Sequence, residues 1–220
     1  RARKHVTKYY AHEMERLGGF PKRLKPLALY PDIDLKRKFL SYDKINEEIL
    51  GYTLSLFNPW KYVPEEFQPL YQTTAQDPFT QADRERFLIG MMKVNFLKRL
   101  ESSVEAFEIT MGNTIAKIDS LEEKIRGFQQ LQRNEGELTA EELTVRDSDD
   151  DDLTEAFEVG GKFKYKLEHL RLDEWLRDLK HDRDQLHLLH LAASDVAPER
   201  DAKLAELKQQ LQGVLSWRGD

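Results

Sequence analysis

Few side chains in this sequence have the type and spacing that chemistry requires. His187 and His190 are three positions apart and Asp184 lies one helical turn earlier, so on a helix they could hold a metal ion. A structural role is favoured, because leucines surround the histidines and no fourth ligand is evident. The patterns GxxxxGK[ST], GxSxG and HExxH do not occur. We therefore predict no catalytic, cofactor-binding or metal-binding residue in this chain.

Basic and aromatic side chains are concentrated near the N-terminus. Residues 1–40 contain eleven Lys or Arg and four Asp or Glu, which gives a local charge of +7. Lysines and arginines lie beside Tyr9 and Tyr10, a mixture suited to phosphate contacts with flanking ring stacking. An ordinary basic surface that packs against an acidic neighbour would have the same composition. The basic residues of this group are Arg1, Arg3, Lys4, Lys8, Lys22, Arg23 and Lys25.

An acidic segment balances this basic region. Residues 134–160 contain eleven Asp or Glu and a single Arg, which gives a local charge of −10. We expect a disordered or mobile tip here, because the run from Asp147 to Asp152 repels itself and contains no apolar residue. The formal net charge of −6 argues against a protein that coats nucleic acid over its whole surface.

The elements that would position these groups differ along the chain. Prolines and glycines exclude long helices from residues 1–82, which we predict to be a loop-rich basic segment. Two short helices fit: residues 3–17, ended by Gly18 and Gly19, and residues 42–52, with Ser41 or Asp43 as N-cap. A cluster of aromatic residues could form part of the core or a surface for a neighbouring domain: Phe57, Trp60, Tyr62, Phe67 and Tyr71.

A different pattern begins at Thr80, which forms a capping box with Asp83 and opens about fifty residues without proline. It predicts one helix over residues 84–133, roughly 75 Å long at 1.5 Å per residue. Apolar residues recur there in alternating steps of three and four, which is a heptad seam. The seam comprises Leu97, Leu100, Val104, Phe107, Met111, Thr114, Ile118, Leu121, Ile125 and Phe128.

Two further arms could cover this seam. The first repeats the spacing from Leu172 to Ala193 and is interrupted at Asp182; the second runs from Leu204 to Val214, in a helix that Pro198 would open. We therefore predict an all-α fold in which residues 83–220 form an antiparallel coiled-coil hairpin or bundle, with the acidic tip between its first two arms.

The chain contains no cysteine and no apolar run near the 20 residues or so that span a bilayer. We expect a cytoplasmic protein without membrane contact. It begins at Arg1 inside a basic segment, and we expect it to be a piece of a longer protein.

Five strings are spread over most of residues 1–132: KHVTKYY, EMERLGGFPKRLKP, ALYPDID, LFNPWKYV and, above all, FLIGMMKVNFLKRLESSVEAF. They resemble bacterial Snf-type DNA helicases of superfamily two, in the helical region between the two RecA-like lobes. The resemblance implies that Arg1 to Lys8 corresponds to the tail of the first lobe, and Lys93 to Phe107 to the helix that leads into the helical protrusion.

The resemblance also implies partners and site residues. The flanking lobes would bind ATP and Mg, and the parent protein would hydrolyse ATP to move along duplex DNA. This region has neither lobe's ATP motifs and would contact the DNA weakly. The implied DNA-binding residues are Arg3, Lys4, Lys8, Lys22, Arg23, Lys25, Lys93, Lys98 and Arg99. Lys98 and Arg99 could instead pair with Glu101 and Glu105 or cover the seam.

The alternative is an autonomous coiled-coil module that binds a protein partner through its seam or its acidic tip. The sequence does not fix the oligomeric state.

Overall fold

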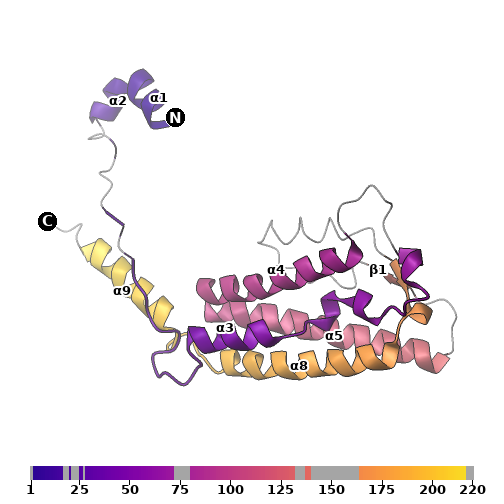
Figure 1. Ribbon diagram of the computed structural model, residues 1–220. Helices are drawn as coiled ribbons and strands as arrows, with labels where there is room; N and C mark the ends of the chain where they lie inside the picture. The colour runs from indigo at the N-terminus through magenta and orange to yellow at the C-terminus, as the bar shows by residue number, and fades with distance from the viewer. Residues whose placement is uncertain are drawn as a thin grey trace. The chain divides into compact units, whose positions relative to one another are not determined.

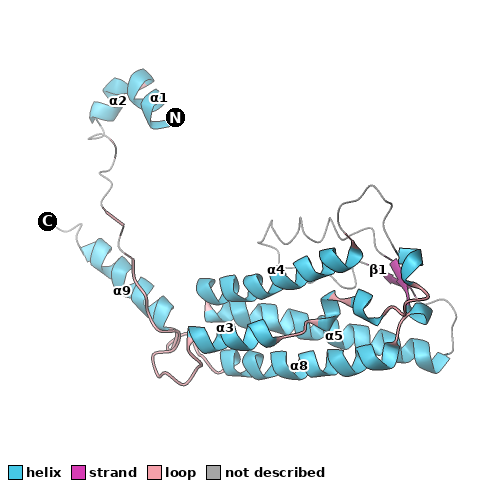
Figure 2. Ribbon diagram, in the orientation of Figure 1, coloured by secondary structure: helices cyan, strands magenta, loops and turns pink. Residues whose placement is uncertain are grey.

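A computed structural model describes residues 2–16, 20, 25–26, 28–71, 80–131, 137–139 and 164–216. The chain divides into two compact units, Arg1–Tyr30 and Pro31–Asp220. Helix dominates the described residues and strand is limited there to one pair of three-residue strands, so the predicted all-α class is confirmed (Figure 2).

The first unit contains α1 (Ala2–Tyr9) and α2 (Ala11–Arg16). The prediction of one helix over residues 3–17 is wrong, because Tyr10 interrupts it. The Tyr10 amide donates to the Val6 carbonyl (2.9 Å), but Tyr10 itself is not helical and α2 begins at the next residue. The predicted C-cap at Gly18 and Gly19 lies outside the described residues.

Three long helices form the body of the second unit: α4 (Gln81–Ser102), α5 (Val104–Leu131) and α8 (Leu172–Ser194). Figure 1 shows α4 and α8 lying along α5. Pairing of α5 with α8 is antiparallel, because Glu108 near the start of α5 contacts His190, whereas Gln129 near its end bonds Asp173.

The predicted single helix over residues 84–133 is wrong, because the chain reverses at Ser103. This residue has an extended backbone (φ −161°, ψ 159°) and separates α4 from α5. The Ser103 hydroxyl accepts a hydrogen bond from the Ala106 amide (3.0 Å) and so caps α5. Both helices face the same core, which is why the apolar spacing continues across the break. The start of α4 is as predicted, with the reciprocal capping box of Thr80 and Asp83.

The core lies between these helices and follows the predicted seams. Eight of the ten seam residues from Leu97 to Phe128 are buried, and the other two are partly buried. From α8 the core receives Trp175, Leu179, Leu186, Leu189 and Ala193. The one polar member of the α5 seam, Thr114, satisfies its hydroxyl by donating to the Thr110 carbonyl (2.8 Å).

Residues 31–71 lie against this bundle and belong to its unit. They contain α3 (Tyr42–Gly51), capped by Ser41 as predicted, and three 3-10 turns: η1 (Ser55–Phe57), η2 (Pro59–Tyr62) and η3 (Gln68–Tyr71). All five residues of the predicted aromatic cluster are buried or packed against the core. The division after Tyr30 therefore differs from the predicted boundary at residue 82.

The acidic segment is described only in part. Residues Glu137–Thr139 form β1, which pairs antiparallel with β2 (Lys164–Lys166), followed by the 3-10 turn η4 (Leu167–His169). Within the predicted disordered tip, β1 is thus an ordered strand. The run from Asp147 to Asp152 lies outside the described residues.

The last helix, α9 (Ala202–Ser216), starts later than predicted. Pro198 lies in the preceding turn, and the Asp201 carboxylate caps the helix by accepting from the Leu204 amide (2.9 Å). Leu207 and Leu211 are 54% and 53% exposed, so the prediction that this arm covers the seam is wrong. Figure 1 shows α9 leading away from the end of the bundle.

Candidate nucleic-acid interface

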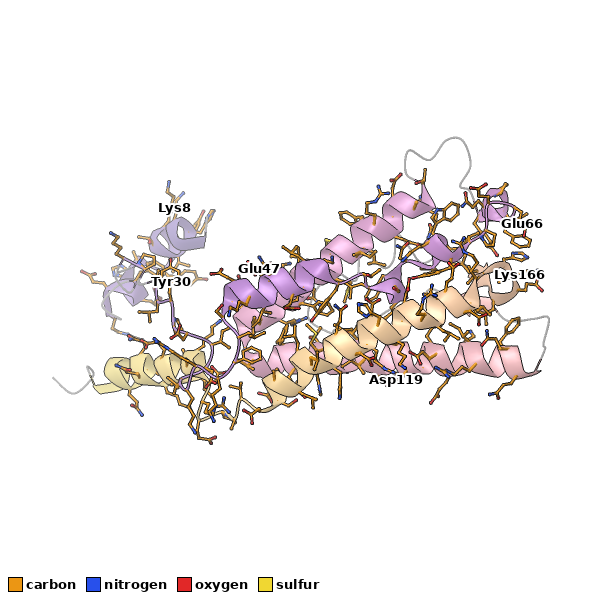
Figure 3. All side chains as sticks on the ribbon, turned by 60° about the horizontal axis from the view of Figure 1, so that its bottom comes forward. Lys8, Tyr30, Glu47, Glu66, Asp119 and Lys166 are labelled. Atoms are coloured by element: carbon orange, nitrogen blue, oxygen red, sulfur yellow. The ribbon has the colours of Figure 1, made fainter. Side chains whose placement is uncertain are left out.

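The first group of predicted site residues lies on α1 and in the chain after it. Helix α1 has the sequence ARKHVTKY, which contains no acidic residue. Lys4 and Lys8 are one turn apart and both are exposed, and Lys25 is also exposed. Figure 3 shows Lys8 and Tyr30 in this unit. Arg3 lies on α1, but its side chain, like Lys22 and Arg23 as a whole, lies outside the described part of the chain.

Rings and cations lie close together on α1. The Lys8 ammonium is 5.4 Å from the centre of the Tyr9 ring, and the His5 ring stacks on the same ring at 6.3 Å. Because a basic helix without carboxylates attracts anions, this surface is suited to phosphate contacts.

The second group, Lys93, Lys98 and Arg99, lies on α4 in the other unit. Lys93 donates to the Leu50 carbonyl at the end of α3 (2.6 Å), and partial burial lowers the pKa of its ammonium. Lys98 is exposed, whereas the Nε and Nη2 atoms of Arg99 are closed off from solvent. Lys93 is therefore tied to the end of α3, and a role in DNA contact stays a prediction for all three residues.

A row of polar side chains on α8 fixes the loop that contains η1. The Asp182 carboxylate is buried and accepts from the Leu54 amide (3.1 Å) and the Ser55 amide (2.5 Å). The Trp175 indole donates to the Ser55 carbonyl (2.9 Å). Leu54 has a positive φ of 53°, unusual for a branched side chain, and these bonds on either side hold it there.

One turn earlier on α8, Asp178 continues the row. Its carboxylate accepts from the Lys61 ammonium and from the Tyr62 hydroxyl, both at 2.8 Å. Burial opposes ionisation of Asp178, but these hydrogen bonds and the Lys61 charge outweigh it and lower the pKa. The pKa of Tyr62 is raised, chiefly by burial.

Glu85 on α4 forms a third polar contact with the same loop. It accepts from the Trp60 amide (2.8 Å), the Gln81 side chain (2.7 Å) and the Tyr165 hydroxyl (2.6 Å). Burial raises the pKa of Glu85 to about 7, although all three hydrogen bonds act in the opposite direction. Glu85 therefore joins η2, α4 and β2 at one end of the bundle.

Asp34 and Arg200 join the start of the second unit to the turn before α9. The guanidinium makes two contacts with the Asp34 carboxylate, Nε to Oδ1 at 3.1 Å and Nη2 to Oδ2 at 2.5 Å. Asp34 is buried and also accepts from three backbone amides, and the bond from Arg200 is the largest cause of its lowered pKa. A buried carboxylate with these partners holds the start of the second unit against the turn before α9, and loss of either partner would leave an unpaired buried charge.

His187 and His190 stack on each other, and His190 Nε2 lies 3.0 Å from a Glu108 carboxylate oxygen on α5. In the described ranges, no three His, Asp or Glu side chains gather in a way that could hold a metal ion. Three of the buried carboxylates, Asp34, Glu85 and Asp182, accept hydrogen bonds from the backbone amides of distant or neighbouring loops and so fix these segments.

Comparison of the chain with known protein families, curated proteins and solved structures found no match. Within the part of the chain that the structure describes, no helix has both the length and the apolar character needed to cross a membrane.

Proposed function

We propose that this chain is the helical region between the motor lobes of a Snf-type ATP-dependent DNA helicase or translocase. In this role it positions the lobes and contacts the DNA backbone but does not catalyse a reaction. ATP and Mg act in the flanking lobes. The family is proposed on the resemblance of the five strings within residues 1–132. The observation that favours the DNA contact is the basic helix α1, which contains no acidic residue.

The second unit has the properties that a spacer between lobes requires. Residues distant in sequence are joined by buried hydrogen bonds, such as Leu54 with Asp182 and Asp34 with Arg200. These bonds join the loop that contains η1 to α8, and the start of the second unit to the turn before α9. A body of this kind can transmit the movement of one attached domain to another.

The test is DNA binding by the full chain at several salt concentrations, measured by fluorescence anisotropy. We expect weak binding whose affinity falls steeply with salt, because phosphate contacts release counterions. Replacement of Lys4, Lys8 and Lys25 by Ala should weaken binding and reduce the salt slope by about one for each phosphate that the protein no longer neutralises.

The matched control is Lys44→Ala, which removes an exposed lysine from α3 in the second unit and should leave binding unchanged. Binding that does not respond to salt, or no binding at low salt, would contradict the DNA contact.

The second candidate is an autonomous coiled-coil interaction module. The exposed Leu207 and Leu211, one turn apart on α9, favour it, because an apolar pair of this kind can pack against another helix. The coiled-coil form of the packing between α5 and α8 was predicted for either candidate and is likewise a proposal. Light scattering of the isolated chain discriminates between the two candidates. Oligomers or complexes that form without motor lobes would support the interaction module, and a stable monomer would support the helicase region.

A further inference from the structure

The chain from Asp34 to Phe39 forms a tight loop in the second unit, shortly before α3. Figure 1 shows the chain before α3 turning at one end of the bundle, next to the start of α9. Every backbone amide of residues 35–39 donates a hydrogen bond to Asp34 or Arg200. The first donates to the Arg200 carbonyl, the third to the Asp34 carbonyl and the others to the Asp34 carboxylate. Asp34 and Arg200 therefore fix the backbone of this loop.

The loop presents three consecutive basic residues with exposed side chains: Lys36, Arg37 and Lys38. Arg200 pairs with both Asp34 and Asp195, so part of the negative charge next to this basic triplet is offset. Three cations on adjacent positions attract an anion more strongly than one does. Because the backbone that carries them is already fixed, an anion would bind them with little further ordering of the chain.

The middle residue of the triplet is held in a strained conformation. Arg37 has a φ of 52°, which glycine or asparagine adopts more easily than arginine does. Its guanidinium pairs with Asp32 at 3.0 Å, but these two side chains are 83% and 61% exposed, and such an ion pair contributes little to stability. Folding therefore does not explain the arginine. Strained backbone is typical of ligand sites, so the position of Arg37 indicates a binding role.

The chemistry of the triplet indicates which ligand fits. A guanidinium offers paired N–H donors that match phosphate oxygens, and lysines add positive charge beside it. All five amides of the loop are bonded within the protein, so a ligand would be held by these side chains and not by a backbone cradle. This arrangement suits the phosphates on the outside of a DNA duplex, which are reached from one side.

We propose that Lys36, Arg37 and Lys38 form a second DNA contact, which binds backbone phosphates of duplex DNA without reading the base sequence. This contact belongs to the second unit, whereas the basic helix α1 belongs to the first. The inference rests on the proposed function, in that it assumes contact with DNA, and it names the residues through which the helical body itself makes that contact.

The experiment uses the full chain and a labelled DNA duplex, with fluorescence anisotropy measured over a series of salt concentrations. The first variant is Arg37→Gly, which removes the guanidinium and relieves the positive φ. The second is a triple variant that combines Arg37→Gly with Lys36→Ala and Lys38→Ala. Lys44→Ala is the matched control, because it removes an exposed lysine from α3 in the same unit.

We expect the slope of log affinity against log salt to fall by about one in Arg37→Gly and by about three in the triple variant. Lys44→Ala should keep the slope of the unchanged chain. Thermal unfolding separates binding from folding. Arg37→Gly should unfold at the same or a higher temperature although it binds more weakly, because glycine relieves the strain. A lower unfolding temperature would assign Arg37 a structural role and contradict the inference.

Two outcomes separate the inference from the function beneath it. The triple variant could keep the slope of the unchanged chain while replacement of Lys4, Lys8 and Lys25 by Ala weakens binding. That result would overturn the site on the loop and leave the DNA contact of α1 standing. Failure of the unchanged chain to bind the duplex at low salt would overturn the proposed DNA contact itself.

Discussion

At the scale of single residues, the buried carboxylate of Asp182 determines how the loop that contains η1 is held. Asp182 interrupts the predicted α8 seam, and the sequence indicates only that a polar group stands at an apolar position. Its partners are the amides of Leu54 and Ser55, the former 128 positions away. Backbone amides have no sequence signature, so this contact could not be predicted. The Thr80 and Asp83 capping box was predictable because both partners lie within one turn.

Replacement of Asp182 by Asn should destabilise the fold by roughly 1.5–3 kcal/mol, because Asn has one acceptor oxygen where two amides donate and lacks the charge that strengthens both bonds. Urea unfolding monitored by circular dichroism measures the change. Asp184→Asn is the matched control on the same helix; its side chain is 63% exposed, and we expect a change within about 0.5 kcal/mol. Equal effects for the two variants would contradict the clamping role of Asp182.

The raised pKa of Glu85 predicts that the stability of the fold depends on pH. Burial raises its pKa from 4.5 to about 7, so the folded state holds this proton more tightly than the unfolded chain does. The stability contributed by this proton is fully present below pH 4.5 and is lost as the pH rises to about 7. The free energy of unfolding should therefore fall over this window more in the unchanged chain than in Glu85→Gln. Urea titrations at about pH 5 and about pH 8 test this, and identical pH profiles for the two proteins would refute it.

At the scale of elements, heptad spacing predicted which residues are buried but not where a helix ends. The seam passes from Leu100 to Val104 without a change of step, because α4 and α5 contribute to one core on either side of the reversal. The signal for the break was Ser103, a good N-cap residue. The prediction for α9 was wrong for another reason. Apolar residues with the heptad spacing can also lie on an exposed face, as Leu207 and Leu211 do, so the spacing alone does not show that a helix packs against the seam.

Ser103→Ala should cost about 0.5–2 kcal/mol, because the first turn of α5 loses the bond from the Ala106 amide to the Ser103 hydroxyl. Thermal and urea unfolding give the value. Ser102→Ala, an exposed neighbour on the last turn of α4, should change stability by less than about 0.5 kcal/mol. A destabilisation at Ser102 as large as that at Ser103 would show that the cap does not set the reversal.

At the scale of the whole molecule, the all-α class and the antiparallel pairing of α5 with α8 could be predicted from the sequence. The division into units could not. Pro and Gly in residues 31–71 indicate loops, but the attachment of these loops to the bundle depends on distant partners such as Arg200 for Asp34 and Asp178 for Tyr62. Of the candidate site, the sequence predicted the basic and aromatic character of α1, and the structure adds the exposed ring of Tyr9 beside Lys8.

Whether this chain lies between the two lobes of a DNA motor is decided most directly by the coding sequence on both sides of it. We expect a phosphate-binding loop and an acidic ATPase motif upstream, and a second RecA-like lobe downstream. Stop signals close to both ends of the segment would contradict the motor proposal and leave the autonomous interaction module.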